Sequence, residues 1–154
     1  MQTIKARMCT LAAVGVSLLF AAQLGAQGEH KSLAGTWVRS VTFDEGIPFD
    51  AVVTFNADGN LTETDQPDAI SHASPGHGVW QRAVDGIYKF KLVKFVFGPT
   101  GVPIGTSVGR GTLRLDSERD SYESAGTNQI LDLNGNVLDT QNFKTSGKRL
   151  QLEE

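Results

Sequence analysis

The stretch Tyr122–Leu152 of this chain reads YESAGTNQILDLNGNVLDTQNFKTSGKRLQL, and it decides the fold class. Asn134-Gly135 at its centre separates two long runs that lack the 3.6-residue apolar period of a helix. Asn-Gly favours a two-residue hairpin, because both residues tolerate the positive φ angles of a type I′ turn. The stretch therefore predicts two long antiparallel strands, Tyr122–Leu133 and Asn136–Leu152.

The chain from Gly35 onward repeats this pattern of extended runs and tight turns. Asn56–Gly59, Asp85-Gly86 and Gly98–Gly101 carry the glycine, proline and Asp-Gly chemistry of turns. Further strands are expected at Gly35–Phe43, Ala51–Phe55, Asn60–Asp65, Gly78–Ala83, Ile87–Phe97 and Pro103–Leu115. This series predicts an all-β fold, a single eight-stranded antiparallel up-and-down barrel, because closure removes unpaired strand edges. A sandwich of two packed sheets is the alternative.

One expected strand, Ile87–Phe97, departs from regular alternation. Its lysines Lys89, Lys91 and Lys94 do not share one parity. A shift of one residue moves the following side chains to the opposite face of a sheet. We therefore expect a β-bulge near Leu92–Lys94.

Two other features mark special positions in the barrel. Gly105, Gly109 and Gly111 interrupt one strand, and such glycines either permit sharp coiling or leave room for a group that approaches the backbone. The longest irregular segment, Gln66–His77, contains two prolines. It is expected to be a surface connection, with a lid over one barrel mouth as the alternative.

Residues 1–26 have the features of a secretory signal peptide. Met1–Arg7 carries two cations and no acid, Met8–Leu24 is mostly apolar, and Gly25 and Ala26 are small. Cleavage after Ala26 would deliver the protein to the periplasm or the exterior, and no second apolar stretch of membrane-spanning length follows. A flexible segment, 27–34, and one barrel domain, 35–152, are expected to remain.

Charge and cysteine content exclude several classes of function. Two of the 14 basic residues and none of the 17 acidic residues lie in 1–26, so the mature chain has a net charge of −5. An acidic surface repels phosphate backbones, which argues against nucleic acid as a partner. The one cysteine, Cys9, also lies in 1–26. The mature chain therefore has no disulfide, no thiol nucleophile and no cysteine-ligated metal.

Residues near the two ends of the expected barrel resemble a known pattern. Gly35-Thr36-Trp37 opens the first strand, and Arg149 lies near the end of the last. This resembles the calycin pattern of lipocalins, in which a Gly-x-Trp packs at the closed end of the barrel under an arginine from the last strand. The resemblance implies a lipocalin-like barrel in which Arg149 packs on Trp37 in a structural role. The mature chain departs from the pattern in having no cysteine and no middle lipocalin motif, so we expect a short barrel of this kind.

The strand around Gly105 resembles a second family of barrels. Gly101–Gly109, GVPIGTSVG, is similar to a strand of allene oxide cyclase-like and dirigent-like barrels. Those barrels include cyclases that steer a reactive substrate in an apolar lumen. This resemblance implies a cyclase or isomerase as an alternative activity.

Side chains on the inner faces of the strands are candidates for ligand contacts. Aromatic residues there either line a cavity for one apolar molecule or fill the barrel. An inward arginine needs a carboxylate from Glu63, Glu123 or a ligand, because an unpaired buried charge is costly. We expect Arg39 to face inward and Arg110 to face water. The candidate ligand-binding residues are Arg39, Phe43, Phe55, Trp80, Tyr88, Phe90, Tyr122 and Asn128.

Three short motifs favour ordinary structure over catalysis or metal binding. Gly105–Gly109 spells Gly-x-Ser-x-Gly, but the helix and the later histidine of a nucleophile elbow are missing. His72 and His77 have the carboxylates of Glu63, Asp65 and Asp68 nearby in the sequence, but the two histidines lack the spacing of helical metal ligands. The Asp-x-Asn-x-Asn run from Asp132 lacks the glycine and glutamate of a calcium loop. No metal and no cofactor is expected.

These observations leave three functions open. The first is an exported protein that binds a small hydrophobic or amphipathic molecule in its lumen. The second is a cyclase or isomerase that restrains a polyunsaturated or polyketide-like substrate. The third is a filled barrel with a structural or interaction role. A cavity with one polar end favours binding, whereas a perturbed carboxylate or tyrosine inside a closed cavity favours catalysis.

Overall fold

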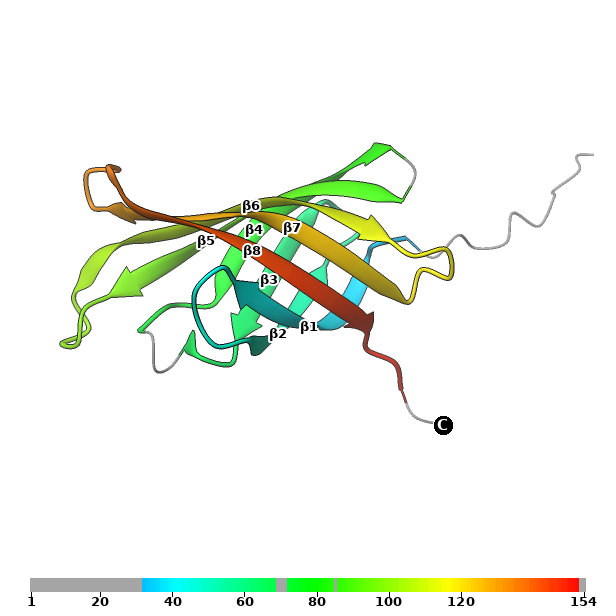
Figure 1. The fold of residues 1–154 in the computed structure, drawn as a ribbon, viewed down its shortest axis with the longest axis horizontal. Helices are drawn as coiled ribbons and strands as arrows, with labels where there is room; N and C mark the ends of the chain where they lie inside the picture. Colours follow the sequence, from blue (N-terminus) through cyan, green and yellow to red (C-terminus); the bar gives the residue numbers. More distant parts are fainter. Residues whose placement is uncertain (1–31, 69–71, 85, 153–154) are drawn as a thin grey trace, which may run out of the picture.

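The computed structural model describes residues 32–68, 72–84 and 86–152, which form a closed antiparallel barrel (Figure 1). Its strands are β1 (Gly35–Phe43), β2 (Phe49–Phe55), β3 (Asn60–Asp65), β4 (Gly76–Val84), β5 (Ile87–Phe97), β6 (Pro103–Leu115), β7 (Ser121–Asp132) and β8 (Val137–Arg149). Each strand pairs with the next along the chain, and β8 pairs with β1 to close the sheet. The up-and-down barrel is confirmed, and the two-sheet sandwich is excluded.

The chain joins the barrel core just before β1 begins, at Leu33. The predicted signal peptide, residues 1–26, lies outside the described residues. Leu33, in the segment expected to precede the barrel, is fully buried, and its carbonyl accepts a hydrogen bond from Trp37 Nε1 at 3.0 Å. Leu33 therefore belongs to the packed core. In the described part of the chain, no helix has the length and apolar character needed to cross a membrane.

The turn between β7 and β8 depends on Asp132 and Gly135. Asp132 Oδ1 accepts hydrogen bonds from the backbone amides of Asn134 and Asn136, each at 2.8 Å. Gly135 has a φ of 84°, which glycine adopts without steric penalty. The Asp-x-Asn-x-Asn run is therefore a turn motif, as its sequence indicated.

The predicted bulge near Leu92–Lys94 is wrong. β5 and β6 stay in register through this region, and the shift lies further on, between Val96 and Phe97. Phe90 and Lys94 share one parity and are both buried. The lysine faces inward because carboxylates inside the barrel compensate its charge, so the strand needs no slip to expose it.

The glycines of β6 have two different roles. A Cβ atom at Gly105 would collide with the backbone carbonyl of Leu131, and one at Gly111 would lie 2.6 Å from the carbonyl of Ala125. These two glycines therefore permit the close approach of β6 and β7. The nearest atoms to a Cβ at Gly109 would be 3.9 Å away, so this position adjoins open space.

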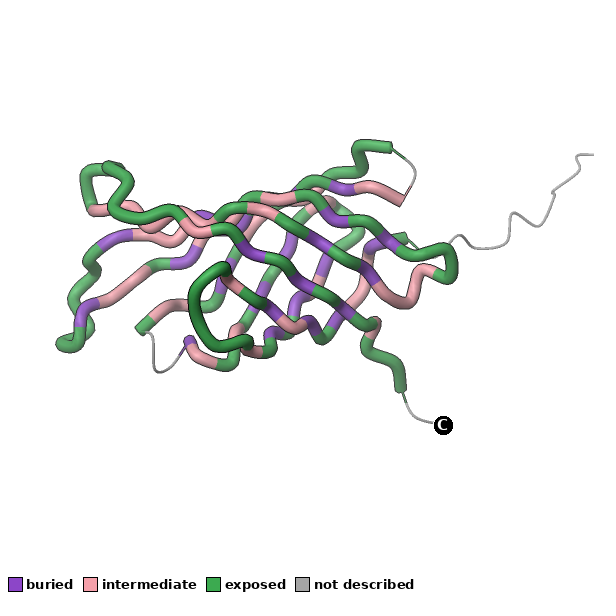
Figure 2. Tube along the Cα trace, viewed as in Figure 1, coloured by how far each residue is buried: buried purple, intermediate pink, exposed green. Residues whose placement is uncertain are grey.

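Buried and exposed positions alternate along the strands (Figure 2), and the buried apolar residues form one core cluster. The core cluster is Leu33, Trp37, Val53, Phe55, Leu61, Tyr88, Phe90, Leu92, Leu113, Leu115, Tyr122 and Phe143. The Trp37 and Tyr122 rings meet edge-to-face at 5.1 Å, and Phe55 meets Tyr122 at 6.4 Å. Together with Leu33, these three rings form what we term the plug, which closes one end of the barrel.

Candidate functional site

Beyond the plug, the barrel holds a partly open cavity of about 300 Å³. Small-molecule pockets have volumes of about 300–1,000 Å³, so this space suits a small ligand. Its apolar wall consists of Val41, Phe43, Phe49, Pro67, Ala73, Phe90, Leu92, Val96, Ile130 and Phe143. Its remaining lining consists of Arg39, Glu63, Asp65, Asp68, Lys94, Ser107, Gly109, Asn128 and Gln141.

The charged lining residues form one ionic cluster, which comprises Arg39, Glu63, Asp65, Asp68 and Lys94. Arg39 on β1 pairs through Nη2 with Oε2 of Glu63 on β3. Only 8% of the Arg39 side chain and 2% of the Glu63 side chain are exposed. An unpaired buried charge is strongly unfavourable. Glu63 is therefore the partner that an inward Arg39 requires.

Lys94 on β5 is held by two aspartates. Its Nζ lies 2.6 Å from Asp65 Oδ2, 2.8 Å from Asp68 Oδ1 and 3.9 Å from Glu63 Oε1. Asp68, in the loop after β3, also accepts a hydrogen bond from the Asp65 amide at 2.8 Å. Lys94 thus joins β5 to β3 and to the loop that follows it.

Within the described residues, the cluster brings three carboxylates to two cations. Burial raises the pKa of Glu63 to about 7, Asp65 adds to the rise, and Arg39 and Lys94 oppose it. Below about pH 7 a proton on Glu63 therefore balances the cluster. Above that pH the five described side chains of the cluster carry a formal charge of −1.

Tyr122 lies beneath the ionic cluster, on the side of the plug. Burial raises the pKa of its hydroxyl to about 12, although Arg39 opposes the shift. The Arg39 Nε and the Tyr122 hydroxyl oxygen are both buried, and neither has a hydrogen-bond partner of good geometry among the described residues. The Arg39 and Tyr122 side chains interact with each other, which connects the ionic cluster to the plug.

A neutral pair completes another part of the wall. Ser107 on β6 donates a hydrogen bond from Oγ to Asn128 Oδ1 on β7 at 2.8 Å. The serine stands inside a regular strand, whereas a nucleophile elbow requires a sharp turn between a strand and a helix. The Gly-x-Ser-x-Gly spelling is therefore part of a barrel strand.

Arg149 covers the plug from outside, as expected. Its guanidinium carbon lies 4.2 Å from the centroid of the Trp37 ring. The same group donates hydrogen bonds to the backbone carbonyls of Ser32, Ala34 and Arg119. The predicted structural contact between Arg149 and Trp37 is confirmed.

The structure divides the eight candidate ligand-binding residues into two groups. Those that line the cavity are Arg39, Phe43, Phe90 and Asn128. The others, Phe55, Trp80, Tyr88 and Tyr122, are absent from its lining and pack edge-to-face in the core, Phe55 with Trp80 and Tyr122, and Trp80 with Tyr88. Alternation identifies the inner face of a strand but carries no information about depth along the barrel axis, and depth separates the two groups.

Sequence reasoning missed three residues of the ionic cluster, Asp65, Asp68 and Lys94. Lys94 continues the inward parity of Phe90, and that parity was the available signal. Lysine is rarely buried without a partner, which favoured a bulge over an inward lysine.

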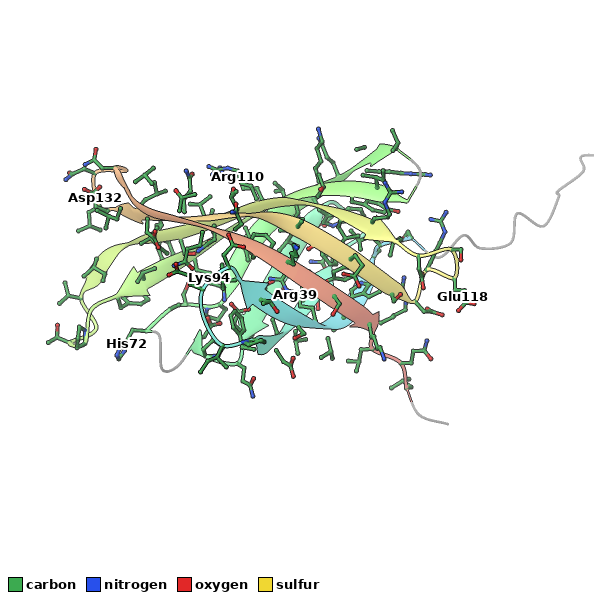
Figure 3. The ribbon with its side chains drawn as sticks, in the orientation of Figure 1. Arg39, His72, Lys94, Arg110, Glu118 and Asp132 are labelled. Atoms are coloured by element: carbon green, nitrogen blue, oxygen red, sulfur yellow. The ribbon has the colours of Figure 1, made fainter. Side chains whose placement is uncertain are left out.

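Arg110 faces outward (Figure 3), and its Nη1 donates to Gln129 Oε1 at 2.9 Å.

No model of a known protein family and no curated protein matches this chain. Its function must therefore be inferred from the cavity and the ionic cluster.

Proposed function

We propose that this protein is an exported, lipocalin-like binding protein that holds one small amphipathic molecule in its lumen. The observation that carries the proposal is a cavity of about 300 Å³ with an aromatic wall and a buried ionic cluster on one side. Apolar pockets with a few placed polar groups are typical of small-molecule sites. A filled barrel would leave no such space, so the cavity favours binding over a purely structural role.

Two further observations support the lipocalin-like and exported parts of the proposal. Arg149 stacks on Trp37 at one end of a closed eight-stranded barrel, as the calycin resemblance implies. The order of basic, apolar and small residues in 1–26 supports export. The partner is then a small hydrophobic or amphipathic molecule met outside the cytoplasm.

Filling the cavity from its wall tests the proposal. Gly109→Leu places a side chain where a Cβ has no neighbour closer than 3.9 Å, so the strand is expected to tolerate it. The leucine would occupy ligand space and abolish uptake of the neutral fluorescent probe N-phenyl-1-naphthylamine. Arg110→Leu is the matched control, because it adds leucine to the outer face of the same strand.

The measurement is a fluorescence titration of the mature protein and both variants, with native mass spectrometry of the protein purified from a periplasm. We expect probe uptake by the wild type and by Arg110→Leu, and a retained small molecule in the mass spectrum. Absence of uptake by the wild type, or equal uptake by Gly109→Leu, would show that the cavity is not a binding site.

Catalysis is the second candidate, and the Glu63 carboxyl is the observation that favours it. Its pKa of about 7 matches the requirement for a general acid or base near neutral pH. The corresponding activity is that of a cyclase or isomerase acting on a polyunsaturated or polyketide-like substrate. Restraint by the aromatic wall would supply most of the rate enhancement.

This second candidate is tested on the molecule recovered from the cavity or on its polyunsaturated analogues. If Glu63 moves a proton, Glu63→Gln is expected to lower the turnover number by about 10²–10⁴-fold. The assay follows conversion by mass spectrometry and chromatography. If the recovered molecule is not converted even by an equimolar amount of protein, the catalytic candidate is rejected and binding remains as the function.

A further inference from the structure

We infer that the molecule held in the cavity carries a protonated amine, which binds beside Glu63 and Asp65 with its apolar part against the phenylalanine wall. This inference rests on the proposed binding function and specifies the chemistry of the ligand. It depends on the cavity and on the way the ionic cluster beside it is paired. The alternatives are a neutral hydroxyl and a carboxylate head group.

Both cations of the cluster already have carboxylate partners. Arg39 pairs with Glu63, and Lys94 lies within 2.8 Å of oxygens of both Asp65 and Asp68. A ligand carboxylate would have to displace one of these side chains and would add a negative charge to a buried excess of carboxylates. Like charges placed together repel strongly, so fatty acids are expected to be excluded from this cavity.

A buried acceptor that lacks a donor lies beside the cavity. Asp65 lines the cavity, and its Oδ1 is buried without a hydrogen-bond partner in the part of the chain that the structure describes. Buried polar atoms are nearly always hydrogen-bonded, so this oxygen requires a donor. Either a proton on the neighbouring Glu63 or an ammonium N–H from a ligand meets the requirement.

The ammonium and the Glu63 proton therefore compete for the same negative charge. Glu63 is faced by Arg39 from β1, Lys94 from β5, Tyr122 from β7 and Asp65 from its own strand. Burial raises its pKa to about 7, so it holds a proton in mildly acidic solution. Binding of a monovalent cation is expected to release that proton, and affinity for the amine should rise with pH up to about pH 7.

The test compares three ligands that share an eight-carbon chain: octylamine, 1-octanol and octanoate. Isothermal titration calorimetry of the mature protein at about pH 7.5 is expected to show octylamine binding at least about tenfold more tightly than octanol, with octanoate weakest. The amine stays protonated at this pH, as lysine does with its pKa of about 10.4. At about pH 6, titrations in buffers of different ionisation enthalpy are expected to show release of close to one proton.

Two variants separate the charge of the cluster from its packing. Glu63→Gln keeps the size of the side chain and removes the titrating charge, so proton release and the preference for octylamine over octanol should both disappear. Arg110→Leu removes a charge from the outer face of β6, away from the cavity lining, and should retain both properties. If Glu63→Gln does not fold, the comparison of the three ligands with the wild-type protein still tests the inference.

Failure of this inference can be distinguished from failure of the proposed function. If octanol or octanoate binds as tightly as octylamine, or only N-phenyl-1-naphthylamine binds, the amine is rejected and the cavity still binds ligands. If neither the three ligands nor the probe binds, the proposed function fails and the inference fails with it.

Discussion

Lys94→Met is expected to lower the free energy of unfolding by about 3–5 kcal/mol at about pH 8, because it breaks a buried ionic cluster from one side. Lys94 has 7% of its side chain exposed and contacts both Asp65 and Asp68. Its removal leaves three carboxylates and one cation, Arg39, among the described side chains of the cluster. Methionine has a similar volume, so the packing of the wall should change little.

The pH dependence of this loss identifies its electrostatic origin. Without Lys94, the pKa of Glu63, already raised to about 7 by burial, should rise further. A carboxyl whose folded pKa lies above its unfolded value binds protons on folding, so its stabilising effect is lost as pH rises through the folded value. Urea denaturation should therefore show a clearly smaller loss at about pH 5 than at about pH 8.

Matched variants isolate the cluster from general effects of charge removal. Lys91→Met removes an exposed lysine from the outer face of the same strand and should change stability by no more than about 0.5 kcal/mol. The double variant Lys94→Met/Glu63→Gln should recover part of the lost free energy of unfolding, because it removes one negative charge together with the positive charge of the lysine. An equal loss at both pH values would mean that Lys94 acts through packing and not through its charge.

Trp37→Ala is expected to destabilise the barrel by about 3–5 kcal/mol, the usual effect of removing a large buried aromatic side chain. The Trp37 side chain is fully buried, and its Nε1 donates to the Leu33 carbonyl. Its ring contacts Tyr122 on one side and the Arg149 guanidinium on another. The substitution opens a void in the plug and removes contacts that join the first and last strands to the segment before the barrel.

Thermal and urea unfolding of the mature protein measure this effect. Phe95→Ala is the control, because Phe95 is 60% exposed on β5 and its truncation should cost no more than about 0.5 kcal/mol. A loss for Trp37→Ala as small as that of the control would contradict the assignment of the plug as the main stabilising element of the closed end.

The placement of the strands could be predicted from sequence because the signals involved are local. The Asn134-Gly135 hairpin and the runs between turns gave the strands to within a few residues, and eight strands in series made closure the natural solution. The Trp37 and Arg149 contact was implied by the resemblance to the calycin pattern, and the pairing of these two residues across β1 and β8 accounts for it.

The cavity and its ionic cluster depended on the tertiary structure. Alternation placed Arg39, Phe90 and Tyr122 on inner faces, but their depth along the barrel axis depends on the tilt and stagger of the strands together. The pairing of Arg39 with Glu63, and of Lys94 with Asp65 and Asp68, joins three non-adjacent parts of the chain.

Local sequence thus determined the hairpins and the barrel, and the calycin resemblance implied the contact of its first and last strands. Only the closed structure decided that one end is filled with aromatic rings while the other holds a cavity with an excess carboxylate. The physical reason is that turn chemistry acts over a few residues, whereas burial of a charge depends on every side chain that closure brings around it.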